Sequence, residues 1–207
     1  MLRALRGDCR DSRKVAVVST SVEPVVPDSD RDIAAVVYER RENPDALMAS
    51  FAADLIEQGF DAIGVVQQPT VARDNAAAVT ELRFLSSRKG ASLLPGEAAP
   101  FPAAMPFAQE WLIGMVRRRP DLIVINRFGS FERAGGGLLH AVREAVTRDI
   151  PVVIAVPQAL FGEWLSVTQG LAVKLECHRL SLDRWWQSLG RTSAAPTPRD
   201  RACETFK

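Results

Sequence analysis

Cysteine and histidine, the residues of disulfide frameworks, metal centres and many hydrolytic sites, are scarce in this sequence. Its 207 residues include three cysteines and two histidines. Cys9 and Cys203 lie in terminal segments, and an odd number of cysteines argues against a disulfide framework. The multi-ligand spacing of zinc sites is missing, as is a serine within a Gly-x-Ser-x-Gly turn. We therefore expect no metal site, no nucleophile–base catalytic residues and a reducing, cytoplasmic location.

Long apolar runs and an excess of charge of one sign are missing too. No segment approaches the roughly 20 consecutive apolar residues of a membrane span. The basic start, MLRALRGDCRDSRK, is followed by an apolar stretch that is too short for a signal peptide. The formal net charge is +1, so no global field attracts nucleic acid or an anionic membrane. We expect neither nucleic-acid binding nor membrane insertion.

Apolar segments of strand length alternate with amphipathic helical segments between residues 32 and 189, which predicts one α/β domain. Its sheet should be mostly parallel, with helices on both faces in a three-layer arrangement. The predicted strands are 33–38, 61–67, 78–85, 121–126, 150–157 and 171–175, and the predicted helices are 44–59, 107–119, 138–149, 159–167 and 181–189. Strands 121–126 and 150–157 should be parallel neighbours in the sheet interior. Residues 1–31 and 190–207 are predicted to be a flexible leader and tail.

The stretch VINRFGSFERAGGG, residues 124–137, carries the polar groups most suggestive of a ligand site. Asn126, Arg127 and Gly129 follow a buried strand, and ligands of such folds bind outside the carboxyl ends of the strands. The fork of an arginine suits an oxyanion, although Arg127 could also be a surface charge. Glu132 is either a base or orienting group, or an ion-pair partner of Arg127 or Arg133.

Three glycines and two basic pairs complete the candidate site. Gly135, Gly136 and Gly137 either let an anion approach the N–H groups of the following helix or form a mobile loop. The basic pairs are Arg40 and Arg41, in the turn after the first strand, and Arg88 and Lys89, in the long loop 86–106. We expect these side chains to face one anion-binding crevice together with Arg127.

Two segments carry a resemblance to a known family. IAAVVY with PDALMASFAADLIEQGFDAIGVVQQ, and PDLIVINRFGSFERAGGGLLHAVREAV with IPVVIAVP, resemble the two halves of small nucleotide-binding α/β proteins. Over about residues 33–189 the chain resembles an uncharacterised bacterial family that is often encoded beside molybdate-uptake genes. That family is itself similar to the P-loop nucleoside-triphosphatases, so the resemblance implies a P-loop-NTPase-like fold.

The chain departs from a working nucleotide hydrolase in both of its motifs. The turn YERRENPD, residues 38–45, stands where a phosphate loop would be, and it has no glycine, no lysine and no Gly-Lys-Ser/Thr. Where the hydrolases hold magnesium with acidic residues, this chain has Asn126 and Arg127, while Gly129 and Glu132 remain. Phosphoryl transfer depends on that metal to neutralise developing charge.

The sequence thus favours a non-catalytic nucleotide- or oxyanion-binding protein with an accessory or regulatory role. A role in molybdenum handling, with molybdate as the anion, is implied only by the resemblance. The alternatives are an active nucleoside-triphosphatase or nucleotide kinase with an unorthodox site, and a scaffold with a vestigial site. The expected partners are a small anionic ligand and either a second copy of the chain or another protein.

Overall fold

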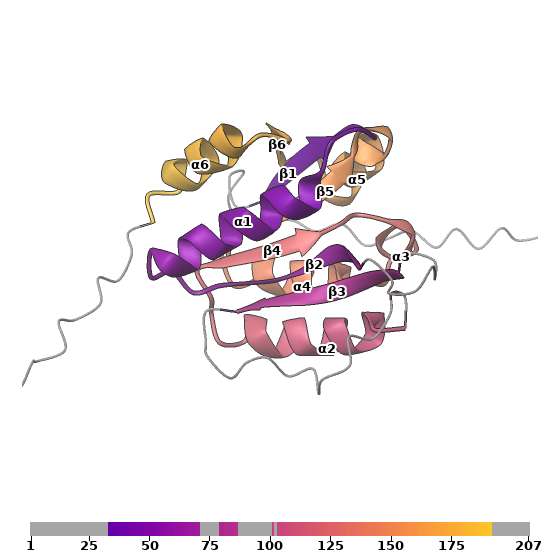
Figure 1. Ribbon diagram of the computed structural model, residues 1–207, viewed down its shortest axis with the longest axis horizontal. Helices are drawn as coiled ribbons and strands as arrows, with labels where there is room; N and C mark the ends of the chain where they lie inside the picture. Colours follow the sequence, from indigo (N-terminus) through magenta and orange to yellow (C-terminus); the bar gives the residue numbers. More distant parts are fainter. Residues whose placement is uncertain (1–32, 71–78, 87–100, 102, 192–207) are drawn as a thin grey trace, which may run out of the picture.

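The computed structural model describes residues 33–70, 79–86, 101 and 103–191 (Figure 1). The predicted leader lies outside the described residues, as do all but the first two residues of the predicted tail. The described part of the chain forms one sheet covered by helices, and its first strand begins at Ile33.

A six-stranded sheet runs in the order β3-β2-β4-β5-β1-β6. Its strands are β1 (Ile33–Tyr38), β2 (Ala62–Thr70), β3 (Val79–Ser86), β4 (Leu122–Asn126), β5 (Val152–Pro157) and β6 (Val173–Glu176). Edge strand β3 is antiparallel to β2, and every other pairing is parallel. The predicted parallel pairing of β4 with β5 inside the sheet is confirmed, with Ile125 opposite Ile154.

The described residues form six helices, and the first begins where local chemistry requires it. They are α1 (Pro44–Glu57), α2 (Met105–Val116), α3 (Ser130–Arg133), α4 (Leu139–Val146), α5 (Phe161–Val167) and α6 (Arg179–Ser188), with a 3-10 turn η1 (Gln158–Leu160) before α5. Asn43 caps α1 by accepting the N–H of Ala46 at 3.2 Å, and Pro44 suits the first turn because it has no N–H to satisfy. Gly59, with φ of 93°, follows the end of α1.

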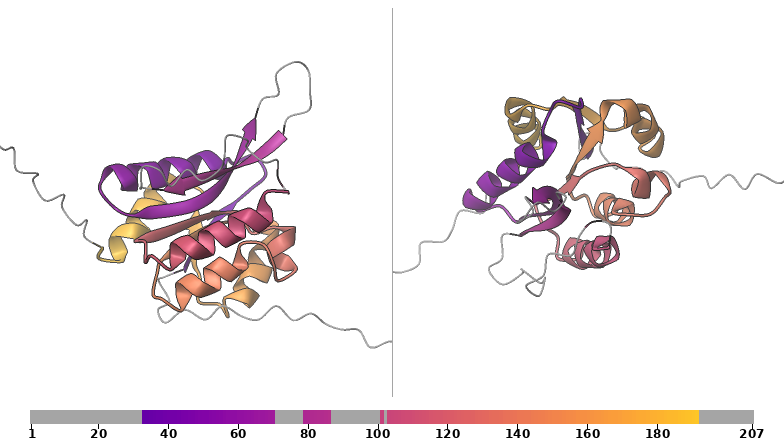
Figure 2. Two further views of the ribbon diagram at one scale, coloured as in Figure 1. Left: turned by 90° about the horizontal axis from the view of Figure 1, so that it is seen from below. Right: turned by 45° about the vertical axis from the view of Figure 1, so that its right-hand side comes forward.

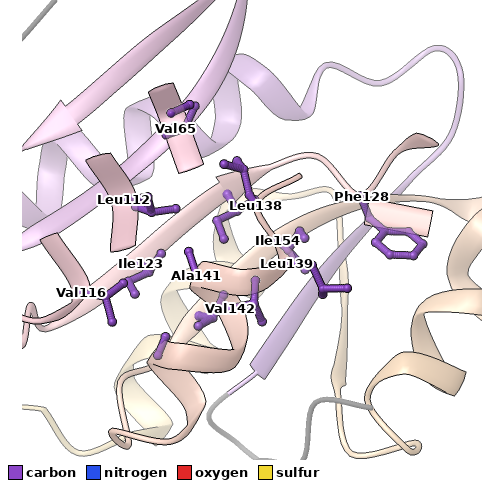
Figure 3. Close-up of a cluster of buried hydrophobic side chains, with 14 of the residues drawn as sticks. Val65, Leu112, Val116, Ile123, Phe128, Leu138, Leu139, Ala141, Val142 and Ile154 are labelled. Carbon is purple, nitrogen blue, oxygen red and sulfur yellow. The ribbon is translucent and has the colours of Figure 1, made fainter. Parts of the chain in front are cut away.

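Two apolar clusters, one on each face of the sheet, hold the helices in place. Ile123 and Ile154 pack on one face with buried residues of α2, α4 and α5 (Figure 3). Val124 and Val153, one residue away, point to the other face and pack with α1 and α6. Figure 2 shows the resulting layers, with α1 on one side of the sheet and α2 and α4 on the other. The predicted three-layer α/β architecture is confirmed.

Several helices and strands begin or end at other residues than predicted, because the chain turns there. The helix predicted to run to residue 149 ends at Val146, because the chain reverses through Asp149, which has φ of 56°. The strand predicted at 171–175 begins later, at Val173, because Gln169 and Gly170 adopt positive φ in the preceding turn. The helix predicted from residue 159 opens as the 3-10 turn η1.

The topology predicts a ligand-binding crevice at the carboxyl ends of β1 and β5. These strands are neighbours, yet the helix after β1 packs on one face of the sheet and the helix after β5 packs on the other. Chains that diverge in this way leave a gap at the strand ends, which is where open α/β folds bind ligands. The arrow of β4 in Figure 1 points to this same edge, where α3 follows.

Close packing of β2 against β4 gives a test of the fold. A Cβ added to Gly64 would stand 2.1 Å from the carbonyl oxygen of Val124 on β4, so the strands must move apart to accept one. We expect Gly64→Ala to lower the free energy of unfolding by about 1–3 kcal/mol. Gly114→Ala, at an open position of α2, is the control and should raise it by roughly 0.5–1 kcal/mol. Equal effects of the two substitutions in urea denaturation would contradict the strand pairing.

Candidate functional site

A crevice of about 940 Å³ lies where the topology predicts it, at the carboxyl ends of β1 and β5. Its walls come from the end of β1 and the turn into α1, from the residue after β4, and from the end of β5 and η1. The lining residues are Tyr38, Glu39, Arg40, Glu42, Asn43, Pro44, Asp45, Arg127, Pro157, Gln158 and Ala159. Its volume is within the range of about 300–1,000 Å³ that is usual for small-molecule sites.

Arg127 is the central cation of the crevice, and it is held by an internal partner. Its Nη2 lies 3.1 Å from both carboxylate oxygens of Asp45, in the first turn of α1. The guanidinium also lies over the ring of Tyr38, 5.7 Å from the ring centre. Burial raises the pKa of Tyr38 above its ordinary value of 10.0, although the charge of Arg127 lowers it. Tyr38 therefore presents a neutral ring at neutral pH.

One part of the Arg127 guanidinium is left without a partner. Its Nε is buried and has no hydrogen-bond partner among the described residues, while the whole side chain is 34% exposed. A buried unpaired donor costs about 1–3 kcal/mol. The hydrogen bonds of this conformation therefore leave Arg127 only partly satisfied.

Three main-chain N–H groups around the turn between β1 and α1 have hydrogen-bond partners nearby in the chain. The N–H of Glu39 donates to the Glu42 carboxylate at 2.6 Å, and the N–H of Glu42 donates to the carbonyl of Glu39 at 3.0 Å. Asn43 takes the N–H of Ala46, and Pro44 has none. The carboxylate of Asp45 also stands at this helix start, where it complements the helix dipole. The turn also has neither the glycines nor the lysine of a phosphate loop.

The four basic residues predicted to face the crevice with Arg127 do not all line it in the structure. Arg40 lines the crevice. Arg41 is exposed and is not among the lining residues. Arg88 and Lys89 lie outside the described residues. Asn126 is the last residue of β4, where its main chain pairs with Ala155.

Glu132 is buried and caps main-chain groups on both sides of itself. It is 4% exposed, and its two oxygens accept the N–H groups of Gly129 and Leu138, each at 3.0 Å. Arg127 pairs with Asp45, and Arg133 pairs with Glu163 at 2.6 Å. The predicted ion pair of Glu132 with Arg127 or Arg133 is therefore wrong. Burial raises the pKa of Glu132, and the two main-chain hydrogen bonds counter part of that rise.

The glycine run packs around Glu132. The N–H groups of Gly135 and Gly136 donate to the carbonyls of Glu132 and Phe131, each at 3.0 Å. Gly137 has φ of 59°, and a Cβ there would stand 2.1 Å from Oε1 of Glu132. Neither sequence interpretation of the run included this role, in which Gly137 leaves space for a buried carboxylate at the start of α4.

A second cavity, the aromatic pocket, adjoins the crevice. It measures about 220 Å³ and is lined by Gln67, Phe101, Met105, Arg127, Gly129, Ser130, Phe131, Glu132 and Leu138. Arg127 lines both cavities. Two predicted residues, Gly129 and Glu132, therefore lie in the wall of the aromatic pocket and not in that of the crevice.

Tyr38, Asp45 and Phe131 are site residues that the sequence interpretation did not single out. The first two carried a usable signal, because Tyr38 ends a buried strand and Asp45 follows the proline that opens the next helix. Both positions fall at the ligand edge of the sheet. Phe131 carried no signal, because its exposure depends on how α3 packs.

The described part of the chain offers few candidates for a nucleophile or a metal site. No group of three or more His, Cys, Asp or Glu side chains there is placed to hold a metal ion. Burial and the nearby Glu42 raise the pKa of Cys177 to about 11, which keeps this thiol protonated and a poor nucleophile. No described helix has the length and apolar character needed to cross a membrane.

Comparisons with known proteins place the fold in a family context. A family model described as "Protein of unknown function (DUF2478)" matches residues 33–185. The chain is 30% identical over 163 residues to the molybdenum import ATP-binding protein ModC 2 of Bradyrhizobium diazoefficiens. That match covers 75% of this chain and 18% of ModC 2. No solved structure matches. The predicted fold class, α/β and P-loop-NTPase-like, is confirmed.

The buried Glu132 predicts a pH dependence of stability. Because its folded-state pKa lies above the ordinary 4.5, folding favours the protonated form, and this contribution is present below pH 4.5. It is lost as the pH rises through the folded-state pKa. The unfolding free energy of the wild type minus that of Glu132→Gln should therefore fall as the pH rises above about 4.5.

Urea denaturation at a series of pH values measures this difference. Glu163→Gln is the control, because Glu163 is an exposed carboxylate that pairs with Arg133. A difference between wild type and Glu132→Gln that stayed constant, or that rose with pH, would contradict the raised pKa.

Proposed function

The chain belongs to the DUF2478 family, and from that premise we propose that it is a non-catalytic protein that binds a small anionic ligand. The ligand, a nucleotide or an oxyanion such as molybdate, would enter the crevice at the ends of β1 and β5, and Arg127 would be its anchor. Arg40, which also lines the crevice, would add positive charge at the entrance.

The state of Arg127 is the observation that carries this proposal. One amino group of its guanidinium contacts Asp45, its Nε is unpaired among the described residues, and it borders a cavity of about 940 Å³. An anion in the crevice would take the place of the Asp45 carboxylate and gain a charge-assisted hydrogen bond. Asp45 is thus the internal competitor of the ligand.

A binding role agrees with the residues better than phosphoryl transfer does. The turn into α1 offers no glycine and no lysine, and the N–H groups of Glu39 and Ala46 already donate to side chains of the turn. The sequence positions expected to hold magnesium carry Asn126 and Arg127, and the positive charge of Arg127 disfavours a cation there. These are the two parts on which phosphoryl transfer relies.

The molybdenum connection comes from the relative. The printed name of ModC 2 describes an ATP-binding protein of molybdenum import, and this chain spans 18% of its length. We infer an accessory or regulatory role in molybdate handling, in which the crevice senses molybdate or a nucleotide.

Substitutions of the two partners of the ion pair, Arg127 and Asp45, should change the affinity for an anion in opposite directions. We expect Arg127→Ala to weaken binding of the anion by about 1.5–3 kcal/mol, the usual value of a hydrogen bond to a charged group. Asp45→Asn should strengthen binding, because it removes the internal competitor. Calorimetric titration with phosphate, sulfate, molybdate, AMP and ATP measures both effects.

Arg133→Ala is the matched control for these titrations. It removes one positive charge from an exposed pair with Glu163, and Arg133 lines neither cavity. The proposal is wrong if none of these anions binds, or if Arg127→Ala and Arg133→Ala leave the same affinity.

Purified protein with magnesium and any common nucleoside triphosphate should show no hydrolysis above background. The physical reason is the missing phosphate cradle together with the missing metal-holding acids. Release of inorganic phosphate is the measurement. Robust hydrolysis that Glu132→Gln abolished would instead establish an active nucleoside-triphosphatase.

A further inference from the structure

The aromatic pocket combines apolar walls with polar groups at its rim. Met105 and Leu138 are buried and supply apolar surface, while Gln67 and Ser130 supply an amide and a hydroxyl. Glu132 also lines the pocket, but both of its oxygens accept main-chain N–H groups. Glu132 therefore fixes the shape of the pocket wall and leaves ligand contacts to its neighbours.

Phe131 is the most unusual wall residue because its ring is partly open to solvent. It is 37% exposed, and its ring makes an edge-to-face contact with the ring of Phe101, with ring centres 5.8 Å apart and planes at 83°. A partly exposed aromatic ring beside a cavity can stack against a planar group.

The size of the pocket limits what it can hold. Its volume of about 220 Å³ is below the range of roughly 300–1,000 Å³ for sites that enclose a whole drug-sized ligand. A single planar ring system suits it better than a complete nucleotide does. The rest of such a ligand would extend past Arg127, which borders both cavities.

We propose that the aromatic pocket receives the base of a nucleotide, with the base stacked on Phe131 and the phosphate held at Arg127. Gln67 carries both a donor and an acceptor, which is the combination that pairs with base edges. An inorganic oxyanion would occupy only the Arg127 end and leave Phe131 uncovered. The phosphate position rests on the proposed function, whereas the base position rests on the aromatic pocket itself.

Phe107 supplies a matched control for Phe131. It is 39% exposed and makes an edge-to-face contact with Phe84 at 5.7 Å, yet it lines none of the cavities described above. Phe107→Ala and Phe131→Ala therefore remove the same side chain from equally exposed aromatic pairs. Only the second substitution touches the aromatic pocket.

The experiment is calorimetric titration of the full chain with AMP, GMP and ribose 5-phosphate. AMP or GMP should bind at least about fivefold more tightly than ribose 5-phosphate, because the base adds a stacking interaction. Phe131→Ala should remove this preference and leave ribose 5-phosphate binding unchanged, whereas Phe107→Ala should keep the preference. Phe131→Tyr, which retains the ring, should also keep it.

The outcomes separate this inference from the proposed function. If ribose 5-phosphate binds through Arg127 but AMP and GMP bind no more tightly, the base subsite is wrong and the anion site stands. Equal loss in Phe131→Ala and Phe107→Ala also overturns the base subsite. If phosphate groups contribute nothing but adenosine or guanosine binds with dependence on Phe131, the anion site is wrong and the base subsite is supported.

Discussion

The ion pair between Arg127 and Asp45 joins two parts of the site that are 82 residues apart in the sequence. Arg127 follows β4, and Asp45 lies in the first turn of α1, which begins after β1. Because β5 separates β1 from β4 in the sheet, this contact bridges the strand ends over β5. It also holds the guanidinium over Tyr38 and between the crevice and the aromatic pocket. The proposed anion site therefore depends on where this one side chain is held.

Carboxylates of the chain occupy two positions that would suit a bound anion. Asp45 stands at the start of α1 and neutralises Arg127. Glu132 stands before α4 and accepts the N–H groups of Gly129 and Leu138, and Gly137 leaves room for it. Helix starts favour negative charge, whether it comes from a ligand or from the protein itself. The two carboxylates differ in one respect, because Asp45 borders the large crevice while Glu132 is buried. Asp45 is therefore the one that a ligand can replace.

The fold could be predicted from the sequence because its signals are local. The apolar strand IAAVVY coincides with β1, and Pro44 marks the start of α1. The crevice could also be placed, since parallel strands bring their polar ends to one edge. The partner of Arg127 could not be predicted, because the contact with Asp45 depends on how α1 packs over the sheet.

The role of Glu132 was beyond sequence reasoning for a related reason. The sequence interpretation allowed a base, an orienting group or an ion-pair partner, and both basic candidates instead have other carboxylates as partners. A sequence does not show which main-chain N–H groups lack a partner. That the N–H groups of Gly129 and Leu138 need a side-chain acceptor is known only from the folded turn around Gly137. The aromatic pocket likewise requires contact between Phe101 and Phe131, which lie 30 positions apart in the sequence.

A double-mutant cycle between Arg127 and Asp45 tests the central claim most directly. Phosphate affinity is measured by calorimetry in the wild type, in Arg127→Ala, in Asp45→Asn and in the double variant. If Asp45 competes with the ligand for Arg127, the gain from Asp45→Asn in the Arg127 background should disappear when Arg127 is replaced by alanine. An equal gain in both backgrounds would mean that Asp45 acts only through its general negative charge, and would contradict the account.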